Sequence, residues 1–543
     1  MTRSTLVHLF RRAYQTAQLA ATLKTSTSEV EGILKEQKQA TLSRRQLLQA
    51  GAFLSGTAIL HPDRLFRSVS PVASDSKVLI VGAGIAGLTA AYRLRQAGVP
   101  VEIAEASDRV GGRLVSLSHH SNAASTVELG GEFIDTRHTA VRSLAAELGL
   151  EMADLKAADV GLDTEIFYFQ GQKVSHGAIA ATFAPLAERI VQDLRRLGKR
   201  ELTYRTPNPA AAELDRLSLA EYLAQADADP VLDQLVRAAY VTEFGRDAED
   251  QSCLNMLYLI GNQTGQWSTY GISDERWHVI GGNEQLPRQL AKSVEDAIAT
   301  GLWLESIREQ SDGRYLVSFR QGSGSVERTY DRILLTLPFS VLRLVSLDVE
   351  LPPAKRQAIA ELGYGTGTKL STPYAERIWR TRYDSTVYIY ADLPFQNTWE
   401  SARYTPGPGG WLTDLRGGTE GVILGSGEAD DHARQLAQDL EPLFPGISQV
   451  ERGRSLRAFW AAEPYAFGSY SCYRPGQWTQ FGGVEGERVG NLWFAGEHCA
   501  MESQGYMNGA CETAELAALD ILQDMGLTVA ANLQRDRVNA LQG

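Results

Sequence analysis

The sequence predicts an α/β fold around a parallel β-sheet, and three observations near the start of its globular part support this. Residues 78–81 are all apolar, as a parallel strand buried on both faces requires. Apolar residues then recur at helical spacing from Ile85 until Gly98 ends the pattern, and residues 101–104 have the composition of a second strand. Strand, helix and strand in this order form a βαβ unit, whose two strands are parallel.

A glycine motif joins the first strand to the helix. Gly82, Gly84 and Gly87 have G-x-G-x-x-G spacing. In a Rossmann-like unit these glycines permit a tight turn, close approach of a pyrophosphate and close helix packing, with the phosphates at the helix N-terminus. Glu105 ends the second strand, where a carboxylate can accept hydrogen bonds from ribose hydroxyls. The arrangement predicts a dinucleotide site, and the alternative is a glycine-rich structural turn.

The residues after the second strand indicate which dinucleotide binds. Glu105, Arg109, Gly111, Gly112 and Arg113 form the pattern E-x-x-x-R-x-G-G-R. This pattern resembles the segment at the same position in the flavin amine oxidase superfamily, and the resemblance implies FAD rather than NAD. Arginines beside glycines suit an extended diphosphate, because guanidinium groups bind phosphate in bidentate fashion. A solvated basic loop is the alternative.

The C-terminal segment carries the same resemblance. "NLWFAGEHCAMESQGYMNGA" is similar to the F-A-G-E and G-Y-M-x-G-A patterns of that superfamily, so the resemblance extends from residue 77 to about residue 525. It implies that Glu497 binds the ribityl chain and that the helix starting near Tyr506 faces the flavin N1 and C2 carbonyl. The cofactor-binding residues that we expect are Gly82, Gly84, Gly87, Glu105, Arg109, Gly112, Arg113, Gly130, Gly131, Glu132, Gly496, Glu497, Gly505, Tyr506 and Met507.

Three residues are candidates for the catalytic site. "AFWAAEPYAFGSY" resembles a region of monoamine oxidases, and this implies that Tyr470 and Tyr506 face each other in front of the flavin. Two tyrosine faces form a slot that favours a cationic or partly positive amine. Lys369, in "GYGTGTKLSTPY", corresponds to the lysine that holds a water against flavin N5. The alternatives are core packing for the tyrosines and a strand-end lysine that reaches solvent.

The substrate is predicted from a position at which this sequence differs from related enzymes. Related L-amino acid oxidases often carry an arginine where "ELGGEFIDTRH" has Phe133, and this favours a mono- or polyamine. Glu132, Asp135 and Glu463 can neutralise a second cationic group. Arg137 can still bind a carboxylate, so a basic L-amino acid such as arginine or lysine is the alternative. The residues assigned to the substrate side are Phe133, Trp460 and Glu463.

The resemblance implies oxidative deamination. A neutral amine transfers a hydride from its α-carbon to flavin N5 and leaves as an imine, which water hydrolyses to a carbonyl compound and ammonia or an amine. Oxygen then reoxidises the flavin and gives hydrogen peroxide. The alternatives outside this class are a flavin desaturase or isomerase, which would not need the tyrosine pair, and a noncatalytic flavin-binding protein.

The FAD is expected to be noncovalent. In monoamine oxidases with covalent FAD a cysteine lies near the first tyrosine of the pair, whereas here Ser469 precedes Tyr470. A hydroxyl is a poor nucleophile without an activating base. Cys472 lies three residues beyond Ser469, about 10 Å along an extended chain and on the opposite side of the strand.

The predicted fold therefore interleaves a Rossmann-like FAD-binding domain with an α+β substrate domain and a helical insertion. The predicted boundaries are 75–145, 276–345 and 452–525 for the FAD-binding domain, 146–250 for the helical insertion, 251–275 and 346–451 for the substrate domain, and 526–543 for a C-terminal tail.

Residues 1–74 are predicted to be a leader. "TLSRRQLLQAGAFLSGTAIL" has Arg44 and Arg45 before a moderately apolar run, which looks like a twin-arginine export signal and predicts a periplasmic protein. The run is too short to span a bilayer comfortably, so no integral membrane span is expected once the signal is removed. An attached N-terminal extension is the alternative.

Composition limits the partners. The chain has 543 residues and a net charge of -12, which argues against binding nucleic acid or anionic membranes. Its four cysteines and nine histidines show no metal-ligand spacing, so no metal is expected. The expected partners are a small amine or amino acid, molecular oxygen and, in a homodimer, a second copy of the chain.

Overall fold

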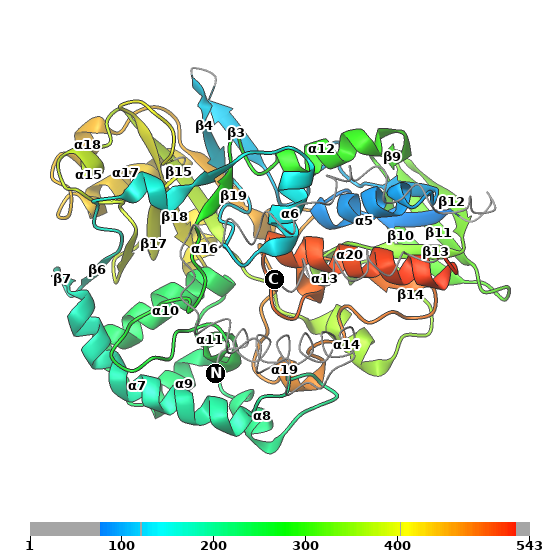
Figure 1. Cartoon of the computed structure of the whole chain (residues 1–543), viewed down its shortest axis with the longest axis horizontal. Coiled ribbons are helices and arrows are strands. Elements are labelled where there is room, and N and C mark those ends of the chain that lie inside the picture. The colour runs from blue at the N-terminus through cyan, green and yellow to red at the C-terminus, as the bar shows by residue number, and fades with distance from the viewer. Residues whose placement is uncertain (1–76, 120–121, 402, 528–543) are drawn as a thin grey trace, which may run out of the picture.

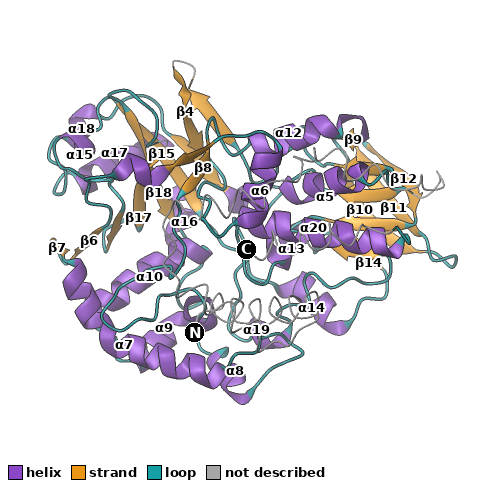
Figure 2. Cartoon of the chain, viewed as in Figure 1, coloured by secondary structure: helices purple, strands orange, loops and turns teal. Residues whose placement is uncertain are grey.

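The structure is a computed structural model that describes residues 77–119, 122–401 and 403–527 (Figure 1). The predicted twin-arginine signal and most of the predicted tail lie outside these residues. Strands gather at the left and at the right of the view in Figure 2, and helices lie between them and along one side.

A five-stranded parallel sheet carries the predicted βαβ unit. Its order is β20-β13-β1-β2-β9. The strands are β1 (Val78–Val81), β2 (Val101–Ala104), β9 (Ile298–Ala299), β13 (Arg332–Leu335) and β20 (Leu492–Phe494). All four residues of β1 are buried, which confirms the prediction of a strand covered on both faces. The sheet joins segments from the two ends of the described chain.

Four helices cover this sheet and one another, and α5 and α20 lie side by side (Figure 1). They are α5 (Ile85–Gln96), α6 (Thr139–Glu147), α12 (Gln285–Ser293) and α20 (Met507–Asp524). Gly98, with φ of 79°, ends the turn after α5 in a left-handed conformation that glycine adopts at little cost. The helix predicted from Ile85 to Gly98 is therefore confirmed.

A mixed seven-stranded sheet, in the order β19-β15-β18-β17-β16-β6-β7, forms the other half of the molecule. Its strands are β6 (Ile166–Phe169), β7 (Gln172–Val174), β15 (Thr368–Tyr374), β16 (Ile389–Ala391), β17 (Asn397–Ser401), β18 (Gly410–Arg416) and β19 (Leu456–Phe459). The helices among these strands are α15 (Ile378–Thr381), α16 (Gly418–Gly425), α17 (Ala429–Leu440) and α18 (Ile447–Val450).

Three smaller sets of strands complete the fold. A four-stranded sheet contains β10 (Trp303–Glu309), β11 (Tyr315–Gln321), β12 (Gly324–Tyr330) and β14 (Ser346–Asp348). The two-stranded pairs are β3 (Ser116–His119) with β4 (Asn122–Glu128), and β5 (Met152–Asp154) with β8 (Trp277–Val279). Short helices α13 (Phe339–Leu342), α14 (Pro353–Glu361) and α19 (Gln477–Gln480) connect these parts.

The segment 146–250, which is predicted as a helical insertion, is not helical throughout. After α6 the next α-helix is α7 (His176–Leu197), because residues 152–174 contain β5, a short 3₁₀-helix (Leu155–Asp159) and the strands β6 and β7. These last two strands join the seven-stranded sheet through pairing of β6 with β16. Residues 166–169 read Ile-Phe-Tyr-Phe, a composition that favours a strand once a partner edge is available. Likewise β19 lies in the segment predicted for the FAD-binding domain but pairs with β15.

The helical layer has clear local causes. It consists of α7 (His176–Leu197), α8 (Pro209–Leu214), α9 (Leu219–Gln225), α10 (Pro230–Phe244) and α11 (Cys253–Leu257). In α10 the side chain of Asp229 caps the first turn, Pro230 occupies the first helical position, and Gly245 ends the helix with φ of 70°. These end signals fix where α10 stops, and its last residues reach the cavity described below.

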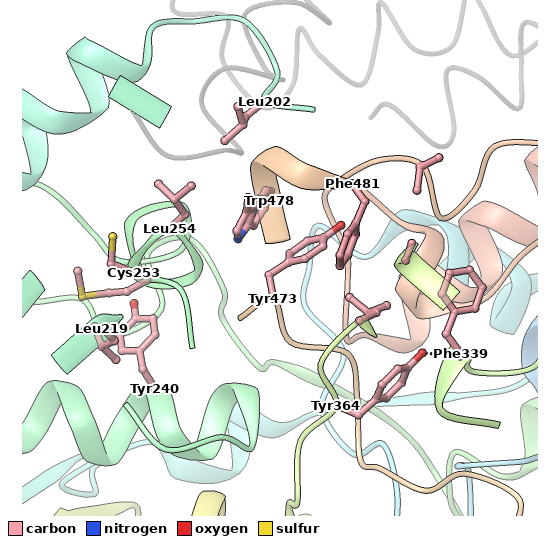
Figure 3. Close-up of a cluster of buried hydrophobic side chains, with 14 of the residues drawn as sticks. Leu202, Leu219, Tyr240, Cys253, Leu254, Phe339, Tyr364, Tyr473, Trp478 and Phe481 are labelled. Carbon is pink, nitrogen blue, oxygen red and sulfur yellow. Dashed lines mark hydrogen bonds between the residues drawn. The ribbon is translucent and has the colours of Figure 1, made fainter. Parts of the chain in front are cut away.

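Several aromatic side chains gather with aliphatic ones in the core between the helical layer and the C-terminal segment (Figure 3). Tyr240, Tyr473 and Phe339 are fully or almost fully buried there. The backbone N–H of Phe339 donates to the hydroxyl of Tyr364 at 2.7 Å, so the buried phenol has a polar partner. Among the described residues, no helix is both long and apolar enough to cross a membrane.

Candidate active site

A cavity of about 320 Å³ runs from the five-stranded sheet to the seven-stranded sheet. Every predicted site residue except Gly87 contributes to its lining. Gly87 instead packs under the turn, where a Cβ atom would lie 2.0 Å from the Gly82 carbonyl oxygen. This matches the close helix packing expected of the third glycine.

The phosphate end of the cavity is formed by the turn before α5. A Cβ atom on Gly84 would meet no atom within 4 Å, so the backbone is open towards the cavity. Gly84 caps α5 without any side-chain hydrogen bond to the first turn, which leaves N–H groups available for an anion. Arg109 lies beside this turn, where it donates to the Gly112 carbonyl at 2.7 Å. A diphosphate fits these residues.

Glu105 stands next to the turn, as predicted. One carboxylate oxygen accepts from the Ala83 N–H at 2.7 Å, and the other accepts from the N–H and hydroxyl of Ser107. These bonds hold the carboxylate at the edge of the cavity. Its hydrogen bonds to a ribose stay a prediction.

Arg113 and Glu497 connect three segments in the middle of the cavity. Arg113 Nη1 donates at 2.9 Å both to Glu497 Oε1 and to the Ser469 carbonyl. Glu497 also accepts from Ser471 and from the Gly505 N–H. Burial acts to raise the pKa of Glu497, but Arg113, His498 and the hydrogen bond from Ser471 together outweigh it, so the pKa lies below its ordinary value. Glu497 therefore orders the turn before α20, and its predicted contact with the ribityl chain is untested.

Lys369 lies on β15 and is not a solvent-exposed strand end. Its Nζ donates at 2.8 Å to Glu132 Oε2 and to the Gly130 carbonyl, and it lies 5.3 Å from the centre of the Trp399 ring. Trp399 Nε1 and the Ser401 hydroxyl donate to the other oxygen of Glu132. Burial acts to raise the pKa of Glu132, but Lys369, His278 and the hydrogen bond from Trp399 together outweigh it and lower the pKa. The Lys369 amino group is thus held at the cavity wall by Glu132 and Gly130.

The two predicted tyrosines are anchored by consecutive residues at the end of α10. The Tyr470 hydroxyl donates to the Thr242 carbonyl at 2.5 Å, and the Tyr506 hydroxyl donates to Glu243 Oε1. A Cβ atom on Gly505 would lie 3.9 Å from the Tyr470 Cβ, so the two tyrosines come from adjoining backbone. Each tyrosine is therefore more than 200 residues away in sequence from the residue that accepts its hydrogen bond, and only the fold brings the two together.

Glu275 is held in the wall by Asp135. One oxygen of Asp135 accepts from the Ser273 hydroxyl and from the N–H groups of Asp274 and Glu275, at 2.8 to 3.2 Å. Glu275 has a φ of 44°, which is rare and strained for a residue other than glycine. The hydrogen bond described for its side chain comes from the Tyr388 hydroxyl at 3.1 Å. The three donors to Asp135 maintain this strained turn.

The carboxyl groups at this end of the cavity are electrostatically unusual. Burial, reinforced by Asp135 and Glu243, raises the pKa of Glu275 to about 8. Burial also raises the pKa of Glu243 to about 7, although the hydrogen bond from Tyr506 acts in the opposite direction. Both groups lie in the cavity wall with Tyr270, Tyr388 and other aromatic residues. A cation placed here would favour their ionised forms.

Residues 85–522 match the family model of flavin-containing amine oxidoreductases. The chain belongs to this family. It is therefore a flavin-containing amine oxidase that uses FAD, and the open Gly84 turn and the Arg109 loop fit that cofactor. The mixed α/β architecture is the one predicted from the sequence.

Relatives of this oxidase span most of its length. It is 25% identical over 485 residues to a flavin-containing amine oxidase of Danio rerio, which covers 84% of this chain and 87% of the relative. It is 24% identical over 469 residues to flavin-containing amine oxidase B of Homo sapiens, with 83% and 86% covered.

Two solved structures share the fold of the oxidase. Wild-type putrescine oxidase bound to putrescine has a TM-score of 0.71 at 20% identity, covering 82% of this chain and 99% of that chain. Cyclohexylamine oxidase from Brevibacterium oxydans IH-35A has a TM-score of 0.70 at 21% identity, covering 83% and 100%.

The predicted substrate-side residues of the oxidase occupy different parts of the cavity. The Phe133 ring packs 5.4 Å from Trp399, near Lys369. Trp460 donates to the Leu129 carbonyl at 2.9 Å. Glu463 lies on the loop that leads to Tyr465, whose ring is 5.6 Å from Trp303. Since Leu302, beside Trp303, bonds to the Glu105 carbonyl, that loop extends towards the nucleotide end.

The cysteine geometry of the oxidase agrees with the expectation of noncovalent FAD. Ser469 lines the cavity, and its hydroxyl accepts from the Gly367 N–H at 3.1 Å. Cys472 is fully buried behind it, where Asn255 donates to its sulfur at 3.4 Å. Burial raises the pKa of Cys472 to about 12, so the thiol is a poor nucleophile. All four cysteines are free, and no cluster of three metal-ligating side chains occurs among the described residues.

Sequence reasoning missed Glu243 and Glu275, which together form what we call the acidic wall of the cavity. Glu243 ends a helix with ordinary capping signals, and Glu275 lies in a loop without a motif. Trp399 and Tyr388 are strand or strand-end residues whose roles depend on which side chains face them. No sequence motif marked these residues. The feature that draws attention to Glu275 is the strained turn that Asp135 supports, and this turn is seen only in the backbone angles of the structure.

Proposed function

We propose that this oxidase deaminates an amine that carries a second cationic group, such as a diamine or polyamine, with oxygen as electron acceptor and hydrogen peroxide as product. The observation that carries the proposal is Glu275, a half-buried carboxyl in the cavity wall that is held in a strained conformation and has a raised pKa. A second ammonium beside Glu275 would compensate the charge that burial penalises. The structural similarity to an oxidase bound to putrescine, a diamine, is consistent with this proposal.

The tyrosine pair would position the reacting amine. The rings of Tyr470 and Tyr506 attract a partly positive nitrogen, and their hydroxyl anchors on Thr242 and Glu243 limit rotation. When bound, FAD supplies the acceptor for the hydride of the α-carbon. Lys369, fixed by Glu132, would hold a water near that acceptor, and the aromatic walls exclude other water.

A basic L-amino acid remains the alternative substrate. The cations that line the main cavity within the described residues are Arg109, Arg113 and Lys369, and each of them is engaged at the cofactor part of the site. Arg137 instead donates to Asp135 and lines a smaller adjoining cavity. Arg403 acts electrostatically on Glu275, but it pairs with Asp159 and does not line the cavity. Among the described residues, a substrate carboxylate therefore has no cavity-lining cation beside Glu275, and this supports an amine.

The first prediction compares a diamine with a monoamine of equal length. In Glu275→Gln, kcat/KM for 1,4-diaminobutane should fall by about 30-fold or more, because one partner of a buried charge pair is lost. The value for butylamine should change by less than about threefold. Glu249→Gln, an exposed acid just beyond α10, is the matched control and should change neither value. An equal fall for both amines, or no fall for either, would contradict the proposal.

A further inference from the structure

A second cavity adjoins the substrate end of the first. It measures about 50 Å³ and shares Glu243, Phe244, Gln504 and Tyr506 with the main cavity. Its remaining lining includes Arg137, Glu502, Asn255 and Trp478. A polar cavity of this size can hold ordered water.

Two side chains point to such water. The Nε2 atom of Gln504 is buried and has no hydrogen-bond partner among the described residues. Glu243 stands between the two cavities, with one carboxylate oxygen accepting from Tyr506. A carboxyl group that faces both cavities can exchange a proton with a molecule on either side.

Amine oxidation requires the neutral form of the reacting amino group. Hydride leaves the α-carbon only when the nitrogen has a lone pair, whereas an alkylammonium with a pKa near that of lysine, about 10.4, is almost wholly protonated at neutral pH. Lys369 donates to Glu132 and to a carbonyl, and the tyrosine hydroxyls of the pair also act as donors. Glu243 is the described carboxyl group that accepts a hydrogen bond from the Tyr506 hydroxyl.

We propose that Glu243 is a catalytic base that takes the proton of the bound ammonium group and passes it to water in the second cavity. The ammonium and the carboxylate become a neutral amine and a carboxylic acid, so charge and protons balance and no oxidant is consumed. Water in the second cavity then carries the proton from Glu243 to bulk solvent, because Arg137, Tyr258 and Glu502 in the cavity lining are partly exposed. This inference rests on amine oxidation but not on the second ammonium group proposed above.

The electrostatic surroundings of Glu243 suit this role. Burial raises its pKa to about 7, and Asp135 acts in the same direction. A base with a pKa near the working pH is efficient because it is ionised and still holds a proton well. The charged groups around it are Asp135, Arg137, Glu275 and Glu502. The tyrosines around it from other elements are Tyr270, Tyr470 and Tyr506.

The test uses the FAD-loaded enzyme and two substrates that differ in ammonium acidity. The rate of anaerobic flavin reduction is measured with the best amine of a panel and with its β,β-difluoro analogue, whose amino group is largely neutral at pH 7.5. Glu243→Gln should slow the ordinary amine by about 10²-fold or more. It should slow the fluorinated amine by less than about tenfold, because that amine needs no base.

Two further variants separate catalysis from structure. Glu243→Asp should restore part of the rate and keep the fall in rate at acidic pH, whereas Glu243→Gln should abolish that fall. Tyr506→Phe removes a hydrogen bond that lowers the pKa of Glu243, so the fall should move to higher pH. Glu249→Gln is the exposed control. An equal loss of rate for both amines in Glu243→Gln, or an unchanged pH profile, would overturn the inference, and either result leaves the diamine selectivity of Glu275 to its own test.

Discussion

At the scale of single residues, the cavity wall depends on how each charge is compensated. Lys369 and Glu132 neutralise each other, whereas Glu243 and Glu275 have neutral tyrosine donors and raised pKa values. The Lys369–Glu132 pair is therefore compensated within the protein, whereas Glu243 and Glu275 respond to a bound cation or proton.

The substitution Lys369→Met tests the role of the Lys369 amino group in catalysis. We expect flavin reduction or reoxidation to slow by well over tenfold with FAD still bound, since a positioned acid-base group commonly contributes about 10²-fold to 10⁴-fold. Stopped-flow measurement of the two half-reactions gives the result, with exposed Lys173→Met as the control. Half-reactions like those of the parent would remove the role of Lys369.

At the scale of elements, α10 and the loop before β8 set the acidic wall. The end of α10 is fixed by Gly245, and the loop is fixed by the hydrogen bonds to Asp135. Both elements place a carboxyl group where folding penalises its ionised form. The penalty should therefore be measurable as a dependence of stability on pH.

The sign of that dependence follows from the raised pKa values. The contributions of Glu243 and Glu275 are fully present below about pH 4.5 and are lost as the pH rises through about 7 and 8. Each pKa unit corresponds to about 1.4 kcal/mol. The double variant Glu243→Gln, Glu275→Gln should thus gain thermal stability relative to the parent between pH 5 and pH 9. Thermal melts across this range measure the difference, and a constant difference would show that neither carboxyl titrates there.

At the scale of the whole molecule, the cavity joins two halves that are distant in sequence. The Gly84 turn and α5 come from the start of the described chain, and Lys369 comes from the seven-stranded sheet. Tyr506 comes from near the end of the described chain, immediately before α20. A cofactor that contacts all of them should stabilise their association, because it binds the folded state alone.

Removal of FAD should accordingly lower the melting temperature, and added FAD should restore it in a concentration-dependent way. At a free FAD concentration of 100 times Kd, the free energy of unfolding should rise by about 2.7 kcal/mol.

Acid precipitation of the purified oxidase should leave yellow flavin in the supernatant, since Cys472 is buried away from the cavity. A yellow pellet with a peptide mass that includes FAD would contradict noncovalent binding.

The sequence by itself determined the βαβ unit, the use of FAD and the family. These features are local: residues 78–105 and 492–510 carry glycines, strands and helix starts in contiguous runs, and such runs fix their own backbone. The predicted strands at residues 101–104 and 492–495 and the helix starting near Tyr506 lie where they were expected.

Only the tertiary structure decided what surrounds the substrate. Asp135, Glu243, Glu275 and Tyr506 come from four separate elements, and no spacing in the chain relates them. The same holds for β6, whose place in the seven-stranded sheet depends on the edge that β16 offers. Local patterns report the backbone of one segment, whereas the pKa values and hydrogen bonds of the acidic wall arise from burial against distant segments.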